Sequence, residues 1–391
     1  MKNESNVYRK LDSTKIIGII GSDDKIITAY ILEEILRNAG YRTGLISKSN
    51  ILVDGKNYII SERDREQFKI NNIVKNMKHE NIDVIIIEIQ SSQIKALCEE
   101  NLEIDILIHT NTMLDEYKND RYLEDKIKLI SSLEDSKIAI INIDDDNSIR
   151  LIEKNKDIIV ISYGLNGKSS ITASSLSLDK VSKFNLCLQR GITTACGNKI
   201  DPLEFPISSN LLGRDSMYNT LAAIGACLYL DISLDTISRT LLNTEGIHRM
   251  LKKIYDKEFI VIDCFADSPS NYESALYTIQ SLDYNKLIIV NSISDEKSKE
   301  VNDKIANIII EWKDILNLEM VLFASNEDNE KTADYYGKMF KDNNIKCKTY
   351  RSLEDSIKEG LNNIKSDDIF LLLGGKDMDN GKEIIRLQKL I

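Results

Sequence analysis

The chain has 391 residues, of which 42% are hydrophobic and 29% charged, a balance typical of a globular protein long enough for two domains. Its formal net charge of −11 disfavours general nucleic-acid binding. Apolar runs are too short to span a membrane, residues 1–15 lack the apolar core of a secretory signal, and six scattered cysteines favour a reducing, cytoplasmic location over disulfides or a zinc site.

The first half of the chain alternates buried-strand patterns with helical patterns, which predicts an α/β domain on a mainly parallel sheet. A continuous apolar run, typical of a strand buried on both faces, lies at 16–20. Further buried-strand candidates lie at 82–89, 104–108, 138–141 and 158–161. After the first run, apolar residues recur at helical spacing from Ile27 to Ala39, and Gly40 supplies the helix end.

Residues 170–189 follow a different pattern. Two alternating apolar stretches flank residues 179–180, which predicts an antiparallel hairpin. We expect this hairpin to form a small β layer packed on the main domain. Helical patterns follow at 216–230 and 234–242.

A domain boundary is predicted near residues 243–246, because the strand and helix alternation restarts after it. The second series of predicted strands lies at 259–263, 287–291, 320–324, 346–350 and 369–373, with helices between them. The sequence therefore predicts an N-terminal tail at 1–14, a central phosphate-loop-type domain at 15–245, and a smaller Rossmann-like α/β domain at 246–391.

The segment from 16 to 28 has the layout of a phosphate-binding loop, with a strand, a tight turn and a helix. Lys25 stands at the position of the lysine in such a loop. Asp24 occupies the place of the glycine before the lysine, and Ile26 occupies the place of the hydroxyl residue after it. On this segment alone, a plain strand–turn–helix connection is the alternative.

Together with later segments, the loop resembles the Mur ligase superfamily, which includes cell-wall peptide ligases and folylpolyglutamate synthases. The family signature is G-[TS]-N-G-K-[TS]-[TS], and Gly21, Ser22 and Lys25 match it. The resemblance runs from about residue 15 to the C-terminus and covers the family's ATP-binding and C-terminal domains. No counterpart of the N-terminal UDP-binding domain is expected.

The resemblance implies a magnesium site. Glu88, within a segment similar to E-L-S-S-F-Q-L, is the implied metal ligand. Residues 110–116 resemble T-N-x-x-x-D-H with Glu116 in place of the histidine, and a carboxylate suits magnesium at least as well. Lys126 corresponds to the lysine that many members carbamylate to hold a second magnesium; a solvated helix lysine is the alternative. Residues 142–145 resemble the family's N-x-D-D turn.

Three further segments resemble motifs that contact ATP in the family. These are G-x-H-N-x-x-N-x-x-A-A at 213–223, G-R-[MLF]-E at 246–251, and D-[DY]-Y-[AG]-x-x-P at 263–269. Asn219 is the implied nucleotide contact, Arg249 the implied phosphate contact, and Asp263 the implied ribose contact. Asp215 and Ser216 replace the His-Asn pair of the first motif.

The family chemistry phosphorylates a carboxylate with ATP and magnesium, and an amine then attacks the acyl phosphate. The resemblance assigns this chemistry to Lys25, Glu88, Lys126 and Arg249. An ionised Asp24 about 4 Å from a phosphate charge would repel it by roughly 4 kcal/mol at an effective dielectric near 20, about a thousandfold in affinity. The Ile26 position offers no ligand to magnesium.

These substitutions predict a member of the superfamily with an impaired ATP site. We expect a pseudoenzyme that acts by binding or regulation, with a protein partner in cell-wall precursor synthesis or a related amide-ligation pathway. One alternative is an active, divergent ATP-dependent amide ligase that acts on a small carboxylate or amino acid. The other is a protein that binds a different anion through Lys25 and Arg249.

Overall fold

The computed structural model describes residues 13–21, 25–48, 50–58, 70–100, 102–111, 120–131, 138–153, 158–292, 298–324 and 330–388. The chain forms two compact units. The N-terminal unit comprises residues 1–177, 183–209 and 215–244. The C-terminal unit comprises residues 245–391 together with the short segments 178–182 and 210–214.

The N-terminal unit is built on a mainly parallel sheet, as the sequence predicts. Its described strands run in the spatial order β13-β10-β9-β8-β7-β6-β1-β5-β2-β3-β4. Their bounds are β1 Lys15–Ile20, β2 Thr43–Ile46, β3 Ile51–Val53, β4 Lys56–Asn57, β5 Val84–Glu88, β6 Ile106–His109, β7 Ile138–Asn142, β8 Ile159–Tyr163, β9 Ile171–Ser177, β10 Ser182–Leu188 and β13 Leu203–Ser209. The six strands from β8 to β2 pair in parallel, and four of them are fully buried, in keeping with a composition of mostly isoleucine, leucine and valine.

The antiparallel strands differ in position from the expected layer. β9 and β10 pair antiparallel, but β9 also joins the main sheet through one parallel pair, Tyr163 with Ile171. The hairpin therefore extends the edge of the main sheet. A separate short pair is formed by β11 (Ile192–Thr193) and β12 (Lys199–Ile200).

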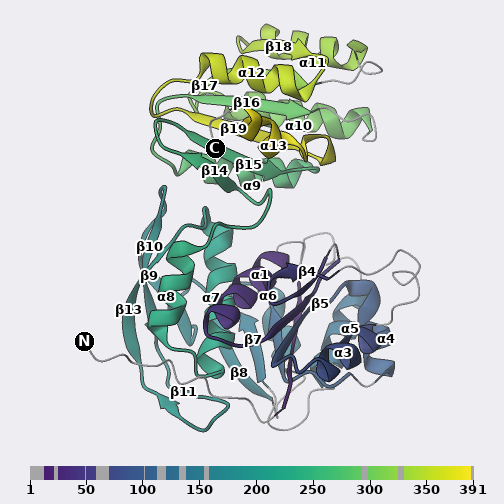
Figure 1. The fold of residues 1–391 in the computed structure, drawn as a ribbon, viewed down its shortest axis with the longest axis vertical. Coiled ribbons are helices and arrows are strands. Elements are labelled where there is room, and N and C mark those ends of the chain that lie inside the picture. Colours follow the sequence, from purple (N-terminus) through teal and green to yellow (C-terminus); the bar gives the residue numbers. More distant parts are fainter. Residues whose placement is uncertain are drawn as a thin grey trace. The chain divides into compact units, whose positions relative to one another are not determined.

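Helices cover both faces of this sheet (Figure 1). Their bounds are α1 Lys25–Asn38, α3 Ile70–His79, α4 Ile94–Glu99, α5 Asp120–Ser131, α6 Asp146–Glu153, α7 Arg214–Tyr229 and α8 Leu234–Asn243, with a 3-10 turn η1 at Ser91–Gln93. Helices α3 to α6 share one apolar cluster with the sheet, while α1 packs on α8. The small residues of α7 let this helix approach β7 of the sheet closely, since a Cβ at Gly225 would lie 3.2 Å from Ile140 Cγ2.

The C-terminal unit has its own sheet, in the order β14-β15-β19-β16-β17-β18. Only β14 pairs antiparallel among these described strands. The strands are β14 Lys252–Asp256, β15 Ile260–Phe265, β16 Leu287–Ser292, β17 Leu318–Ala324, β18 Lys346–Tyr350 and β19 Ile369–Gly374. The helices are α9 Pro269–Gln280, α10 Lys299–Trp312, α11 Glu330–Asp342, α12 Leu353–Asn363 and α13 Gly381–Leu387, with a 3-10 turn η4 at Lys376–Met378.

Two apolar clusters hold this unit together. One lies between the sheet and α9, α10 and α11, and the other between the sheet and α12 and α13. Three helices begin with a serine whose hydroxyl accepts a backbone N–H, at Ser268, Ser298 and Ser352. Pro269 opens α9, as expected from the sequence. In neither unit is any described helix long and apolar enough to cross a membrane.

Candidate functional site

The described residues of the predicted loop, Gly21 and Lys25, lie at the carboxyl ends of the parallel strands in the N-terminal unit, where α/β proteins bind ligands. Gly21 follows β1 with φ +147°, and a Cβ there would lie 1.9 Å from Thr110 Oγ1. Only glycine fits this position, because the chain leaving β1 passes directly beside the end of β6. Ser22 and Asp24 lie outside the described residues, as does Glu116.

Lys25 and Glu88 are brought together. Lys25 is the first residue of α1, and its Nζ lies 3.6 Å from Glu88 Oε1, with both side chains buried. The Glu88 carboxylate also accepts hydrogen bonds from the Lys48 backbone N–H at 3.0 Å and from Gln90 Nε2 at 2.9 Å. The two residues predicted to face phosphate and magnesium therefore face each other.

Ile26 and Thr28 lie in the first turn of α1, and Asn219 lies on α7. Thr28 Oγ1 donates a hydrogen bond of 2.9 Å to Asn219 Oδ1, which ties α1 to α7 in the interior. Ile26 belongs to the buried apolar core. Its side chain carries no oxygen, so this position contributes no ligand to a metal ion.

Lys126 lies in a buried polar cluster with His109. Lys126 is 0% exposed, so the alternative of a solvated surface lysine is wrong. Burial lowers the pKa of His109 well below 6.5, and the charge of Lys126 lowers it further. The His109 Nε2 atom lies 3.8 Å from Asp145 Oδ2, and Nδ1 lies 3.2 Å from Ser148 Oγ. Because His109 is neutral, its contact with Asp145 is polar rather than an ion pair.

His109 was missed by sequence reasoning. It is the last residue of β6 and ends the apolar run at 104–108. A histidine that closes a buried strand is a usable signal, but its neighbours Lys126 and Ser148 come from other elements. Only the folded chain brings them together.

A cavity of about 260 Å³ opens beside these residues, within the N-terminal unit. The described residues of its lining are polar and include three carboxylates but no lysine or arginine: Thr110, Asn111, Asn142, Asp144, Asp145, Asp215, Tyr218 and Asn219. Tyr218 donates a hydrogen bond of 3.0 Å to Asp144 Oδ2, and the backbone N–H of Leu165 donates one of 2.7 Å to the same oxygen. This lining disfavours a phosphate, because the nearby fixed charges are negative.

The implied magnesium site does not assemble from the described residues alone. Among them, no three histidine, cysteine or acidic side chains are placed to hold one metal ion. Glu88 is held by Lys25 and two further donors, so its free lone pairs are few.

Arg249 and Asp263 form a buried pair in the C-terminal unit. Arg249 Nε lies 3.1 Å from Asp263 Oδ1, and the two side chains are 3% and 1% exposed. Burial raises the pKa of Asp263, and Arg249 opposes that rise. The two residues predicted to reach phosphate and ribose thus bind each other.

The remaining donors of Arg249 are also used. One terminal nitrogen donates to the Gly375 carbonyl at 2.6 Å and to Asp379 Oδ1 at 2.5 Å. The other donates to the Gly374 carbonyl at 2.7 Å and to the Cys264 carbonyl at 3.4 Å. A guanidinium has five N–H groups, so every donor of Arg249 has a partner in its own unit.

The family model described as the Mur ligase middle domain matches residues 19–227, more than half of the chain. The chain belongs to the Mur ligase family. A UDP-N-acetylmuramoyl-L-alanyl-D-glutamate–2,6-diaminopimelate ligase of Bacillus velezensis is 24% identical over 375 residues, covering 92% of this chain and 73% of the relative. The corresponding ligase 1 of Clostridium acetobutylicum is 25% identical, covering 94% and 73%.

Solved Mur ligase structures share the fold. A UDP-N-acetylmuramoyl-L-alanyl-D-glutamate–2,6-diaminopimelate ligase superposes with a TM-score of 0.71 at 16% identity, covering 97% of this chain and 79% of the other. Folylpolyglutamate synthase of Thermotoga maritima gives 0.70 at 15% identity, covering 97% and 90%. FolC of E. coli, solved with DHPP and ADP, gives 0.66 at 16% identity, covering 96% and 90%.

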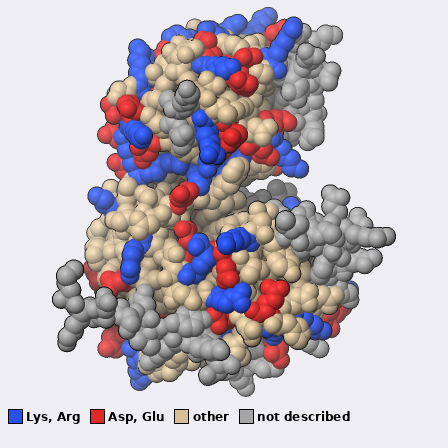
Figure 2. Space-filling model, viewed as in Figure 1, with Lys and Arg blue, Asp and Glu red and all other residues tan. Residues whose placement is uncertain are grey.

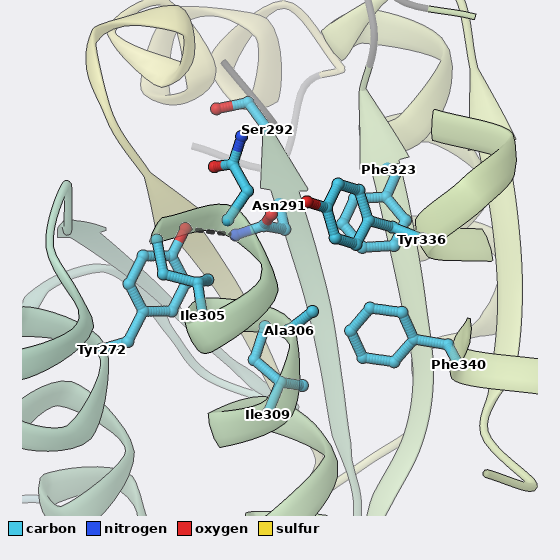
Figure 3. Close-up of a pocket in the computed structure, with 10 residues that line it drawn as sticks. Tyr272, Asn291, Ser292, Ile305, Ala306, Ile309, Phe323, Tyr336 and Phe340 are labelled. Atoms are coloured by element: carbon cyan, nitrogen blue, oxygen red, sulfur yellow. Dashed lines mark hydrogen bonds between the residues drawn. The ribbon is translucent and has the colours of Figure 1, made fainter. Parts of the chain in front are cut away.

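The C-terminal unit of this Mur ligase family member encloses a much smaller cavity (Figure 3). It lies at the carboxyl ends of β16 and β17, has a volume of about 10 Å³, and is large enough for one water molecule. Asn291 Nδ2 donates a hydrogen bond of 2.5 Å to the Tyr272 hydroxyl on its wall. The Ser292 hydroxyl makes no hydrogen bond with any described residue. A cavity of this size is too small for an amino-acid substrate.

Proposed function

We propose that this Mur ligase family protein has lost or greatly weakened ATP-driven ligation and acts by binding a protein partner. Its role would be regulation of a protein partner in cell-wall precursor synthesis or a related amide-ligation pathway, in the cytoplasm. Membership of the family and its ligase relatives support the pathway. The charge pattern agrees, since Figure 2 draws lysine and arginine among aspartate and glutamate on both units, a pattern that does not favour nucleic acid.

The observation that carries the proposal is the complete internal satisfaction of Arg249. A phosphate-binding arginine must offer N–H groups to the ligand, whereas all five donors of Arg249 meet acceptors of the C-terminal unit. Two further observations support the proposal: Ile26, which offers no metal ligand, lies in the core, and Lys25 pairs with Glu88. Asp24 adds a negative charge where the loop would receive the triphosphate.

An active, divergent amide ligase is the second candidate. The adjacency of Lys25 and Glu88 favours it, because Glu88 ends β5 and Lys25 opens α1 at the edge of the sheet where a ligase would hold ATP and magnesium. The burial of Lys126 also favours it, since it places this lysine in the interior of the unit and not on a solvated helix face. In that case Lys126 would carry the carbamate, and a small carboxylate or amino acid would be the substrate.

Restoring the loop separates the two candidates. We expect the double variant Asp24→Gly, Ile26→Thr to gain magnesium-dependent ATP binding that the native protein lacks, measured by equilibrium titration. Adding Lys25→Ala to this variant is the control and should abolish the gain. Equal ATP affinity in the native and the restored protein would contradict the proposal.

A further inference from the structure

Two aromatic rings meet at the surface of the C-terminal unit. The ring of Tyr277 in α9 stands edge-on to that of Trp312 in α10, with centroids 6.4 Å apart and an interplanar angle of 83°. Tyr277 is 52% exposed. Ile315, in the turn that continues α10, is 54% exposed. We call these three residues the Tyr277–Trp312–Ile315 patch.

The patch is held rigidly by the core beneath it. Trp312 packs against the apolar cluster under α9, α10 and α11, and α9 packs on α10. The Leu316 N–H donates to the Trp312 carbonyl at 3.0 Å, which keeps Ile315 on a helical turn. The Tyr284 hydroxyl fastens the same turn by donating to the Leu316 carbonyl at 2.9 Å. Rigid, half-exposed tyrosine and tryptophan side chains are the usual anchors of protein interfaces.

The rim of the patch is acidic. Glu273 precedes Tyr277 by one helical turn, Glu311 precedes Ile315 by one turn, and Asp314 lies between Trp312 and Ile315. All three carboxylates are exposed, and none forms an ion pair within the described part of the chain. The neighbouring Lys313 is positively charged, and its Nζ is directed toward the end of α11, where it donates to the Asn343 carbonyl at 2.8 Å.

We propose that the Tyr277–Trp312–Ile315 patch docks a basic amphipathic helix of a protein partner. The apolar face of that helix would cover the patch, and its lysine or arginine side chains would meet Glu273, Glu311 and Asp314. On the patch, each glutamate stands one turn from an apolar residue, and an amphipathic helix presents charges and apolar groups at the same spacing. This inference rests on the proposed function, because it names the class of partner through which the protein acts.

The only tryptophan of the chain lies in the patch, so its fluorescence reports binding directly. We would titrate the full chain with a short amphipathic helical peptide of leucine and lysine. A saturable shift of the Trp312 emission is expected. Tyr277→Ala and Glu311→Lys should each weaken the affinity by about tenfold, the effect of losing one interface anchor or charge pair.

Tyr335→Ala is the matched control, since Tyr335 is a 47% exposed tyrosine on α11 outside the patch, and it should bind the peptide like the native chain. Circular dichroism confirms that each variant is folded. An unchanged emission, or equal affinity for a leucine and glutamate peptide, would overturn the proposal. So would concentration-dependent self-association that Tyr277→Ala abolishes, because the patch would then bind a second copy. ATP titration is a separate measurement. A patch that does not bind the peptide leaves the proposal about the ATP site unaffected, and ATP binding by the native protein leaves the proposal about the patch testable by the peptide titration.

Discussion

Arg249 adopts a left-handed backbone conformation, with φ +56°, and its guanidinium joins the ends of β15 and β19. This conformation is rare for a residue with a side chain, and the five hydrogen bonds offset its cost. We predict that Arg249→Ala destabilises the protein by about 3–5 kcal/mol, because it leaves the Asp263 carboxylate buried without its cation. Chemical denaturation measures this loss.

Two further variants test the cause. Asp263→Asn combined with Arg249→Ala should recover part of the lost stability, because it removes the stranded charge. Arg386→Ala is the control, since Arg386 is an exposed arginine whose charge partner, Glu383, lies 3.8 Å away on the surface. This variant should change stability by less than about 1 kcal/mol. Equal effects of Arg249→Ala and Arg386→Ala would refute a structural role for Arg249.

His109 sets a pH dependence at the residue scale. Its pKa in the folded protein is lowered well below 6.5, chiefly by burial, whereas the unfolded chain takes up a proton near pH 6.5. The unfolded state therefore binds more protons in this range, and stability falls as the pH drops below 6.5 toward the folded-state pKa. A single proton contributes a slope of up to about 1.4 kcal/mol per pH unit.

The variant His109→Asn should lose this component of the acid sensitivity. Denaturant titrations of the native and variant proteins from neutral to mildly acidic pH would measure it. A variant whose stability falls with acidity as steeply as that of the native protein would show that His109 is not the titrating group.

At the scale of elements, α12 approaches its sheet through Gly360. A Cβ at this position would lie 2.3 Å from Phe370 Cε2 and 3.1 Å from Leu322 Cδ1. Gly360→Ala should therefore destabilise the protein by about 1–3 kcal/mol through overpacking, even though alanine favours helices. Thermal unfolding measures the loss.

Gly337 in α11 provides the matched comparison. A Cβ there would meet Thr349 Cγ2 at 3.5 Å, an ordinary contact. Gly337→Ala should leave stability unchanged or raise it by about 0.4–1 kcal/mol. If both alanine variants behaved alike, the close approach of α12 would not limit packing.

The elements that the sequence predicted well are those whose pattern is local. Largely apolar stretches gave strands close to β5, β7 and β19, because burial on both faces leaves mostly apolar side chains. The short strands β2 to β4 were not predicted, since two to four residues carry no periodicity. The placement of the hairpin at the sheet edge depends on one pair, Tyr163 with Ile171, and such a long-range pairing leaves no local pattern.

The same limit applied to the candidate site. Lys25 and Glu88 could be paired from the sequence, because parallel strands end at one edge of a sheet. The five partners of Arg249 could not, because three are backbone carbonyls that any sequence supplies. The sequence therefore predicts a phosphate contact at Arg249, and the structure adds that this side chain is buried and hydrogen-bonded within its own unit.

For the whole molecule, we propose that this Mur ligase family chain keeps the family fold while its ATP site no longer binds ATP. The family model covers the region that contains Lys25, Glu88 and Asn219, so the claim concerns the side chains of that region and not its architecture. The parts most directly altered, Asp24 and Ile26, are those that would meet phosphate and magnesium.

Calorimetric titration of the native protein with ATP, in the presence and absence of magnesium, tests this claim most directly. The account predicts no heat of binding up to millimolar ATP in either condition. Magnesium-dependent binding in the micromolar range would contradict it and would establish a working nucleotide site.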